Sequence, residues 1–226
     1  MSIEETQQLR LIAFEGFIRR AAEVEAPFML KGSLITRQYY EEPTDRIPGD
    51  LDWIYLEPIE DVKSAEEKFN EWAIAVTQIK KNDGVKFRNF TKNAFWREID
   101  YAMADDFPTV NTDILCWVDG KEVEFGMDLS FNLPLEYPPI YLVYRPIRGD
   151  AFHLSNTVPL CLQISWKVHQ SLIRPRFKDF LDLMHLVQHW SFNDTVLAEA
   201  TASPPSFLGD DKISVGFLSL ISMPHL

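Results

Sequence analysis

Apolar side chains in the first part of the chain recur every three or four residues, at Leu9, Ile12, Ala13, Phe17, Ile18 and Ala21. This spacing predicts an amphipathic helix over about residues 4–25. The same periodicity predicts a helix over residues 64–81, with Ser64 as its N-cap. Two more helical patterns cover residues 160–174 and 177–190, and the apolar stripe of the last one is predicted to lie in the core.

Short apolar runs and alternating patterns predict the strands. One apolar run covers residues 51–56, and strand patterns follow over residues 95–103 and 109–118. The Asp-Gly pair at residues 119–120 predicts a tight hairpin, because this pair suits turns whose twist matches that of paired strands. In the returning strand, residues 122–131, every second side chain is apolar and is expected to face one side of the sheet.

The order of these elements predicts an α+β fold, with a small mixed β-sheet flanked by helices and a helical C-terminal half. We expect the sheet and its helices within residues 1–133. Residues 134–157, which are rich in proline, are predicted to form an extended connector. Residues 158–226 then form the helical part, and the short apolar segment after Ser203 receives no assignment.

The composition fits a folded chain of 226 residues, of which 46% are hydrophobic, with a net charge of −12 and a sequence pI of about 4.8. This acidic balance argues against a protein that coats nucleic acid in general. Cys116 and Cys161 lack the spacing of a zinc site or a disulfide framework. The polar N-terminus and the lack of apolar runs near the roughly 20 residues of a membrane span predict a cytoplasmic protein with no membrane partner.

Two carboxylates stand at the start of a predicted core strand in the stretch RIPGDLDWIYLEP, which begins at Arg46. Asp50 and Asp52 are two residues apart, so in a strand they project from the same face. Asp128 lies on the polar face of the strand over residues 122–131, and the carboxylates converge if the two strands are neighbours. Such a cluster repels itself unless cations bind in it, and carboxylates are ligands that Mg²⁺ prefers.

These acids also have simpler explanations. One of the pair can cap a turn at the entry to the strand, and Asp128 can be an ordinary solvent-facing residue. The upstream residues Gly32 and Ser33 favour a functional role. A glycine turn that opens into a helix presents free N–H groups to phosphate oxygens, and Ser33 is the expected N-cap of that helix.

The spacing of these residues resembles the signature of the nucleotidyltransferase superfamily, which includes DNA polymerase beta. Gly32-Ser33 is followed, after a gap of sixteen residues, by Asp50-Leu-Asp52 at the start of an apolar strand. The resemblance implies that Gly32 and Ser33 hold the phosphates of a nucleoside triphosphate and that Asp50 and Asp52 bind Mg²⁺ or Mn²⁺. It also implies a third acid on a later strand, for which Asp128 is the best match.

A second motif resembles that of the AbiEii/AbiGii-type abortive-infection toxins. Lys167 is followed by Arg174 and then by the run Lys-Asp-Phe-Leu-Asp at residues 178–182. Arg46 matches the first position of the family pattern Arg-x-Ser-x-Asp-x-Asp. Two departures concern the contacts of single side chains: Pro48 stands where the family has Ser, and Lys-Gly-Ser replaces the usual Gly-Gly.

The toxin resemblance implies the Mg²⁺-dependent transfer of a nucleoside monophosphate from a nucleoside triphosphate to an acceptor hydroxyl. It further implies a tRNA 3′ end as the acceptor and an antitoxin protein as a partner. Transfer to a small molecule, as in aminoglycoside nucleotidyltransferases, and a non-catalytic protein that binds nucleotide or a partner are the alternatives. The implied catalytic residues are Asp50, Asp52, Asp128, Lys167 and Asp179, and the implied nucleotide-binding residues are Gly32, Ser33, Lys167 and Arg174.

Lys167 and Arg174 are seven residues apart, so on one helix they share a face and both can reach one anionic ligand. Asp179 falls in the first turn of the next helix, where a carboxylate suits the helix dipole. It can therefore stabilise the helix start or hold Lys167 in place. Asp182 is expected to be structural and to pair with a basic residue within 174–178.

A basic segment stands out in this acidic chain, with Lys80, Lys81, Lys86, Arg88, Lys92 and Arg97. Phe87, Phe90, Phe95 and Trp96 lie between them. Such a segment can bind an RNA backbone and stack bases on its aromatic rings. The alternative is a helix end followed by a solvated hairpin.

Overall fold

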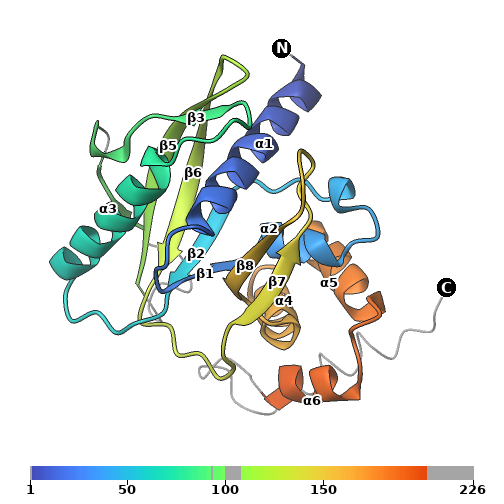
Figure 1. Ribbon diagram of the computed structural model, residues 1–226. Helices are drawn as coiled ribbons and strands as arrows, with labels where there is room; N and C mark the ends of the chain where they lie inside the picture. The colour runs from blue at the N-terminus through green and yellow to red at the C-terminus, as the bar shows by residue number, and fades with distance from the viewer. Residues whose placement is uncertain (1, 93, 100–107, 203–226) are drawn as a thin grey trace.

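The computed structural model describes residues 2–92, 94–99 and 108–202 (Figure 1). The α-helices are α1 (Ile3–Ala21), α2 (Ser33–Thr36), α3 (Val62–Gln78), α4 (Leu160–Ile173), α5 (Phe177–Gln188) and α6 (Asp194–Ala202). Short 3₁₀ turns are η1 (Arg37–Tyr39), η2 (Pro43–Asp45) and η3 (Phe90–Lys92). The strands are β1 (Phe28–Lys31), β2 (Leu51–Tyr55), β3 (Val85–Phe87), β4 (Arg97–Glu98), β5 (Thr109–Val118), β6 (Lys121–Ser130), β7 (Ile140–Tyr144) and β8 (Phe152–Thr157).

The strands of the described residues form one mixed sheet in the order β3–β5–β6–β2–β1–β8–β7, with β4 paired to β5. β2 runs antiparallel to β1 and parallel to β6, and β1 runs parallel to β8. The predicted hairpin is confirmed, because β5 and β6 pair in antiparallel fashion and both Asp119 and Gly120 have positive φ. The expected mixture of helices and a mixed sheet is therefore present.

The sequence suggested that the proline-rich residues 134–157 form only an extended connector. The structure shows that they do more. β7 and β8 form an antiparallel pair within this segment, and β8 joins the main sheet beside β1. The prolines at 138, 139 and 146 stand outside both strands, where their missing N–H groups remove no ladder hydrogen bond. The sheet is thus larger than predicted, and the helical C-terminal part begins only at Leu160.

Two long helices begin at side-chain caps. Asp61, rather than the predicted Ser64, caps α3 by accepting a hydrogen bond from the Ser64 backbone N–H at 2.8 Å. At the start of α1, the Ser2 hydroxyl accepts a hydrogen bond from the Glu5 N–H at 3.1 Å. Each cap satisfies a backbone donor that has no partner within its helix.

Helices lie against different parts of the sheet (Figure 1). α1 and α3 lie side by side near β3, β5 and β6, and aromatic rings fill the space there: Phe17 meets Trp72 edge to face at 5.6 Å between centroids. α4, α5 and α6 gather near β7 and β8. From α4, the Gln163 side chain donates a hydrogen bond to the Gly32 carbonyl at 2.9 Å, so this helix reaches the C-terminal end of β1.

The orientation of α5 corrects the prediction that its apolar stripe is core. Phe177 is 84% exposed and Met184 is 54% exposed, whereas Asp179 and Asp182 are fully buried. Both aspartates are paired with Lys167 inside the protein. Leu183 and Leu186 are buried on the same face, so the inward face of α5 combines paired charges with apolar side chains. Buried charges need such partners, and apolar periodicity alone does not reveal them.

Some predicted features lie partly or wholly outside the described residues. Of the strand expected over residues 95–103, the structure shows β4, and the apolar segment after Ser203 is outside the described part of the chain. Within the described residues, no helix has the length and apolar character needed to cross a bilayer.

Candidate active site

Three carboxylates meet where β2 and β6 run side by side. Asp50 lies in the turn before β2, Asp52 is the second residue of β2, and Asp128 stands directly opposite Asp52 on β6. Each residue offers one carboxylate oxygen, and these oxygens all lie within 4.8 Å of one another. We call these three residues the acid cluster. The structure thus brings together the three acids that the sequence singled out as metal ligands.

The acid cluster carries unbalanced negative charge, since none of its carboxylates forms an ion pair with another described residue. Burial, and then the charge of Asp50, raise the pKa of Asp52 to about 7. Burial also raises the pKa of Asp128. A bound cation relieves this repulsion, and three carboxylate oxygens suit a hard divalent ion such as Mg²⁺ or Mn²⁺. The residues present therefore fit a metal site.

Gly32 brings the chain after β1 into direct contact with the acid cluster. Its φ is +74°, and a Cβ at this position would lie 2.2 Å from Oδ2 of Asp52. Only glycine allows so close an approach of backbone to carboxylate. Gly32 is also the N-cap of α2. The prediction that Ser33 caps this helix is therefore wrong, because Ser33 is its first residue.

The hydroxyl of Ser33 is buried and has no hydrogen-bond partner among the described residues. The turn that carries it is fixed from α4, because Gln163 donates to the Gly32 carbonyl at 2.9 Å and to the Thr36 hydroxyl. A buried polar group without a partner costs about 1–3 kcal/mol. This hydroxyl is therefore suited to a ligand that brings its own acceptor, such as a phosphate oxygen.

A second group of buried charges joins α4, α5 and the loop before β2. Lys167 contacts Asp179 at 3.1 Å and Asp182 at 2.6 Å, and Arg176 contacts Asp179 at 2.6 Å. Arg46 donates to both carboxylate oxygens of Asp182, at 2.7 and 3.2 Å. We call these five residues the ionic network. Asp179 thus holds Lys167, which is one of the two roles expected for it.

The ionic network gives Asp182 partners that were not predicted. They come from α4 and from the loop before β2, and the Tyr40 hydroxyl also donates to Asp182 at 2.8 Å. Burial opposes ionisation, but Arg46 and Lys167 hold the pKa of Asp182 below its ordinary value. Because Arg46 stands four residues before Asp50, the network ties α5 to the loop that carries one member of the acid cluster.

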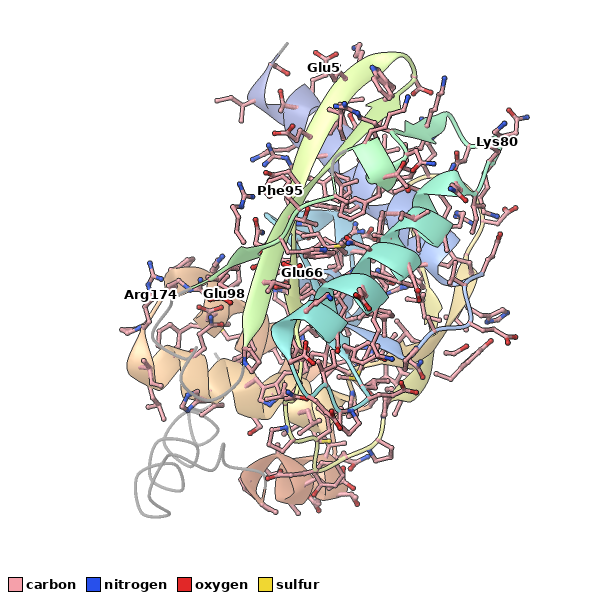
Figure 2. The ribbon with its side chains drawn as sticks, turned by 90° about the vertical axis from the view of Figure 1, so that its left-hand side faces the viewer. Glu5, Glu66, Lys80, Phe95, Glu98 and Arg174 are labelled. Atoms are coloured by element: carbon pink, nitrogen blue, oxygen red, sulfur yellow. The ribbon has the colours of Figure 1, made fainter. Side chains whose placement is uncertain are left out.

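Arg174 does not share a helix face with Lys167, contrary to the expectation. α4 ends at Ile173, and the backbone of Arg174 leaves the helical conformation at φ −137° and ψ 78°. Lys167 is buried, whereas Arg174 is exposed and points away from the body of the protein (Figure 2). The structure therefore places Lys167, but not Arg174, among the buried charges near the site.

The basic segment keeps most of its charges exposed but loses part of its aromatic surface. Lys80, Lys86, Arg88 and Lys92 are exposed, while Lys81 pairs with Glu23 and Arg97 pairs with Asp113. Phe87 and Phe90 are buried in the core, so they cannot stack on bases, and Phe95 is 41% exposed. The segment is thus a set of exposed cations without most of the aromatic surface needed to stack bases. Figure 2 shows that Lys80, in this segment, and Arg174, in the C-terminal motif, lie at opposite edges of the protein.

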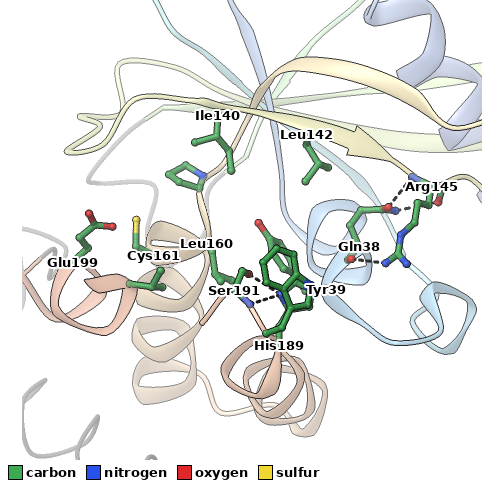
Figure 3. A pocket seen from close by; sticks show the side chains of 13 residues that line it. Gln38, Tyr39, Ile140, Leu142, Arg145, Leu160, Cys161, His189, Ser191 and Glu199 are labelled. Atoms are coloured by element: carbon green, nitrogen blue, oxygen red, sulfur yellow. Dashed lines mark hydrogen bonds between the residues drawn. The ribbon is translucent and has the colours of Figure 1, made fainter. Parts of the chain in front are cut away.

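A separate hollow of about 490 Å³ lies between β7, α4 and α6 (Figure 3). Its described lining residues include Cys161 and His189, and none belongs to the acid cluster or the ionic network. Polar groups at its edge already have partners within the protein: the Arg145 N–H donates to Gln38 at 2.8 Å, and the Arg145 guanidinium donates to the Gln38 carbonyl at 2.7 Å. The hollow is therefore not part of the candidate active site.

Three residues beside the acid cluster were not anticipated. Lys31 stands opposite Asp52 on β1, Asn111 stands opposite Asp128 on β5, and Gln163 holds the Gly32 turn. The place of Lys31 depends on the register of β1 with β2, which no local pattern specifies across such a separation. Asn111 carried a signal, because the Asp119-Gly120 turn fixes the register of the β5–β6 hairpin and so sets Asn111 opposite Asp128. Gln163 carried a signal, since it is a polar residue within the apolar run Leu-Cys-Leu-Gln-Ile.

Two solved structures are similar to this chain over most of its length. One is a candidate nucleotidyltransferase from H. pylori, with 16% identity and a TM-score of 0.49 over 100% of this chain and 86% of that one. The other is JHP933 from Helicobacter pylori, with 12% identity and a TM-score of 0.46 over 97% of this chain and 91% of that one. No family model and no curated protein matches the chain.

Proposed function

We propose that this chain is a nucleotidyltransferase, which moves a nucleoside monophosphate from a nucleoside triphosphate to an acceptor hydroxyl. One observation carries the proposal: the acid cluster lies directly against the Gly32 turn, so close that a Cβ on Gly32 would lie 2.2 Å from Asp52. A cation site and a turn suited to phosphate are thereby joined in one place. The reaction needs both, because its catalysis consists largely of positioning and charge neutralisation.

Each residue then has a separate task. Asp50, Asp52 and Asp128 would hold Mg²⁺ or Mn²⁺, which when bound neutralises charge on the phosphates. The N–H groups of the Gly32 turn and the Ser33 hydroxyl would bind the β- and γ-phosphates. The acceptor oxygen bonds to the α-phosphorus, the bond to the β-phosphate oxygen breaks, and pyrophosphate leaves.

The proton of the acceptor hydroxyl needs a base, and we assign this task to Asp128. Asp128 is the acid of the cluster that lies on the neighbouring strand, directly opposite Asp52, and a carboxylate can accept the proton of the acceptor hydroxyl. Lys167 supplies positive charge: it lowers the pKa of Asp52, so its field reaches the acid cluster. Asp179 contacts the Lys167 ammonium at 3.1 Å and would orient it toward the triphosphate.

The acceptor that we propose is an RNA 3′ end, specifically that of tRNA, as the toxin-like motif implies. The exposed Lys80, Lys86, Arg88 and Lys92 support an RNA backbone contact. We also propose that the protein belongs to the AbiEii-like class and has an antitoxin partner. The residues of the toxin-like motif support this proposal. Lys167, Asp179, Asp182 and Arg46 come from distant positions but join in one ionic network.

The test is incubation with labelled nucleoside triphosphates, Mg²⁺ and total RNA, in parallel with an aminoglycoside as a small cationic acceptor. Wild-type protein should label RNA, Asp52→Asn should not, and Glu124→Gln, which changes an exposed acid on the same strand as Asp128, should behave as wild type. Label on the aminoglycoside alone would assign a small-molecule acceptor. Nucleotide binding without transfer to either acceptor would contradict an enzymatic function.

A further inference from the structure

Five residues from five adjacent strands form one row across the sheet. The cross-strand register pairs Lys31 with Asp52, Asp52 with Asp128, Asp128 with Asn111, and Asn111 with Arg97. Two carboxylates therefore stand in the middle, with a lysine on one side and an amide followed by an arginine on the other. The amide and the arginine have no task in the proposed reaction.

Asn111 contacts Asp128 through a defined side of its amide. Its Nδ2 donates a hydrogen bond to Oδ1 of Asp128, while its Oδ1 accepts one from Nη2 of Arg97 at 2.5 Å. A guanidinium has donors only, so it requires the carbonyl oxygen of the amide to face it. The NH₂ group of Asn111 is then left to face Asp128.

Arg97 is itself held in place. Its Nη2 contacts Asp113 at 2.7 Å, and its guanidinium lies over the Phe95 ring at 5.0 Å. Asp113 belongs to β5, two residues beyond Asn111 on the same strand face. Arg97, which the sequence suggested as an RNA contact, therefore anchors the outer end of a chain of hydrogen bonds that ends at Asp128.

We propose that Asn111 and Arg97 are positioning residues for the acid cluster. Asn111 occupies one oxygen of Asp128 and so keeps that carboxylate in one orientation toward Asp50 and Asp52, and Arg97 fixes the amide that does this. β5 and β6 already pair along their whole length through the backbone, so the sheet does not need this side-chain bond. The inference rests on the proposed function, because it takes the acid cluster to be a cation site.

The test measures Mn²⁺ affinity alone, from the electron paramagnetic resonance signal of free Mn²⁺ at pH 8. Asn111→Leu removes the donor at similar side-chain size and should weaken Mn²⁺ binding about tenfold, as is usual for residues that orient metal ligands. Arg97→Leu should weaken it about threefold to tenfold. The double variant should be no weaker than Asn111→Leu, because Arg97 acts through Asn111.

The sign of the Arg97→Leu effect separates positioning from simple electrostatics. Removing a cation near a cation site should tighten Mn²⁺ binding if charge alone matters. Lys63→Leu is the control, since Lys63 is an exposed cation on α3 that has no part in the proposed site, and it should leave the affinity unchanged. Tighter binding by Arg97→Leu, or unchanged binding by Asn111→Leu in a protein of wild-type thermal midpoint, would overturn the inference.

The same measurements distinguish a failure of the proposed metal site from a failure of the positioning role alone. If wild-type protein and Asp52→Asn bind Mn²⁺ equally, or neither binds it, the acid cluster is no cation site and both proposals fall. If Asp52→Asn loses binding that Asn111→Leu retains in full, the metal site stands and the positioning role alone is lost.

Discussion

The acid cluster and the ionic network are both built around aspartates, but they differ in burial and in the balance of charge. In the ionic network, two fully buried carboxylates face three cations, and the closest contact of each ion pair is 2.6 to 3.1 Å. In the acid cluster, three carboxylates lie within 4.8 Å of one another, and none has an ion pair among the described residues. The carboxylates of the ionic network thus have their cationic partners within the folded protein, and those of the acid cluster do not.

This difference also appears in the ionisation of single residues. The pKa of Asp182 is held low despite burial by Arg46 and Lys167, whereas burial and Asp50 raise the pKa of Asp52 to about 7. The same residue type is thus stabilised as an anion in one place and destabilised in the other. Charge balance therefore distinguishes carboxylates that hold the fold together from carboxylates that are suited to a cation.

The largest expected effect is on the stability of the ionic network. Asp182→Asn leaves Arg46 and Lys167 buried with too little negative charge, and it should lower the free energy of unfolding by about 3–5 kcal/mol. Urea denaturation measures this. The matched variant Asp52→Asn should cost nothing in metal-free protein, because it removes repulsion. Equal losses in the two variants would erase the distinction between the groups.

A pH series should show the two groups changing stability in opposite directions. The folded pKa of Asp52 is about 7, above its unfolded value, so its contribution is full below about pH 4 and is lost as the pH rises through 7. Asp182 has a lowered pKa, so its contribution is present at neutral pH and is lost on acidification. Between pH 5 and 8, in EDTA, metal-free wild type should lose about 2–4 kcal/mol relative to Asp52→Asn. A constant difference would show that Asp52 is not perturbed.

A divalent cation should remove this penalty. At 100 times its dissociation constant, Mn²⁺ or Mg²⁺ should raise the free energy of unfolding by about 2.7 kcal/mol through preferential binding to the folded protein. Asp52→Asn should abolish the increase. A conservative change in the network, Arg176→Lys, should retain it, because Arg176 contacts Asp179 and not the acid cluster. Stabilisation that survives Asp52→Asn would place the ion elsewhere.

The sequence predicted what local patterns control. Alternation along residues 122–131 placed Asp128 on the polar face of β6, and the Asp-Gly pair placed the hairpin, because one buried face and one tight turn specify both. The apolar run that begins at Leu51 predicted a strand there, and this placed Asp50 and Asp52 at its entry. These local features placed each carboxylate on its strand, but the meeting of the three still depended on β2 and β6 being neighbours, which local patterns did not predict.

What depends on distant partners was not predicted. α5 turns Asp179 and Asp182 inward because Lys167 and Arg46 meet them there, and Arg46 is 136 residues from Asp182 in the chain. Apolar periodicity contains no information about such partners, so it assigned the exposed Phe177 face to the core. The strands within residues 134–157 were not predicted, because the prolines that flank them indicated an extended connector.

The smallest expected effect concerns Lys31, the one basic residue in direct register with the acid cluster on the β1 side. Its charge lowers the pKa of both Asp52 and Asp128, so it partly balances the cluster and competes with a metal ion. At pH 8, where proton competition is weak, Lys31→Met should tighten Mn²⁺ binding about twofold to fivefold, or roughly 0.5–1 kcal/mol. This is opposite in sign to the effect expected for Arg97→Leu, although both variants remove one cation near the same carboxylates. If both variants shift the affinity in the same direction, the protein treats its two flanking cations alike, and the assignment of Arg97 to positioning through Asn111 loses its basis.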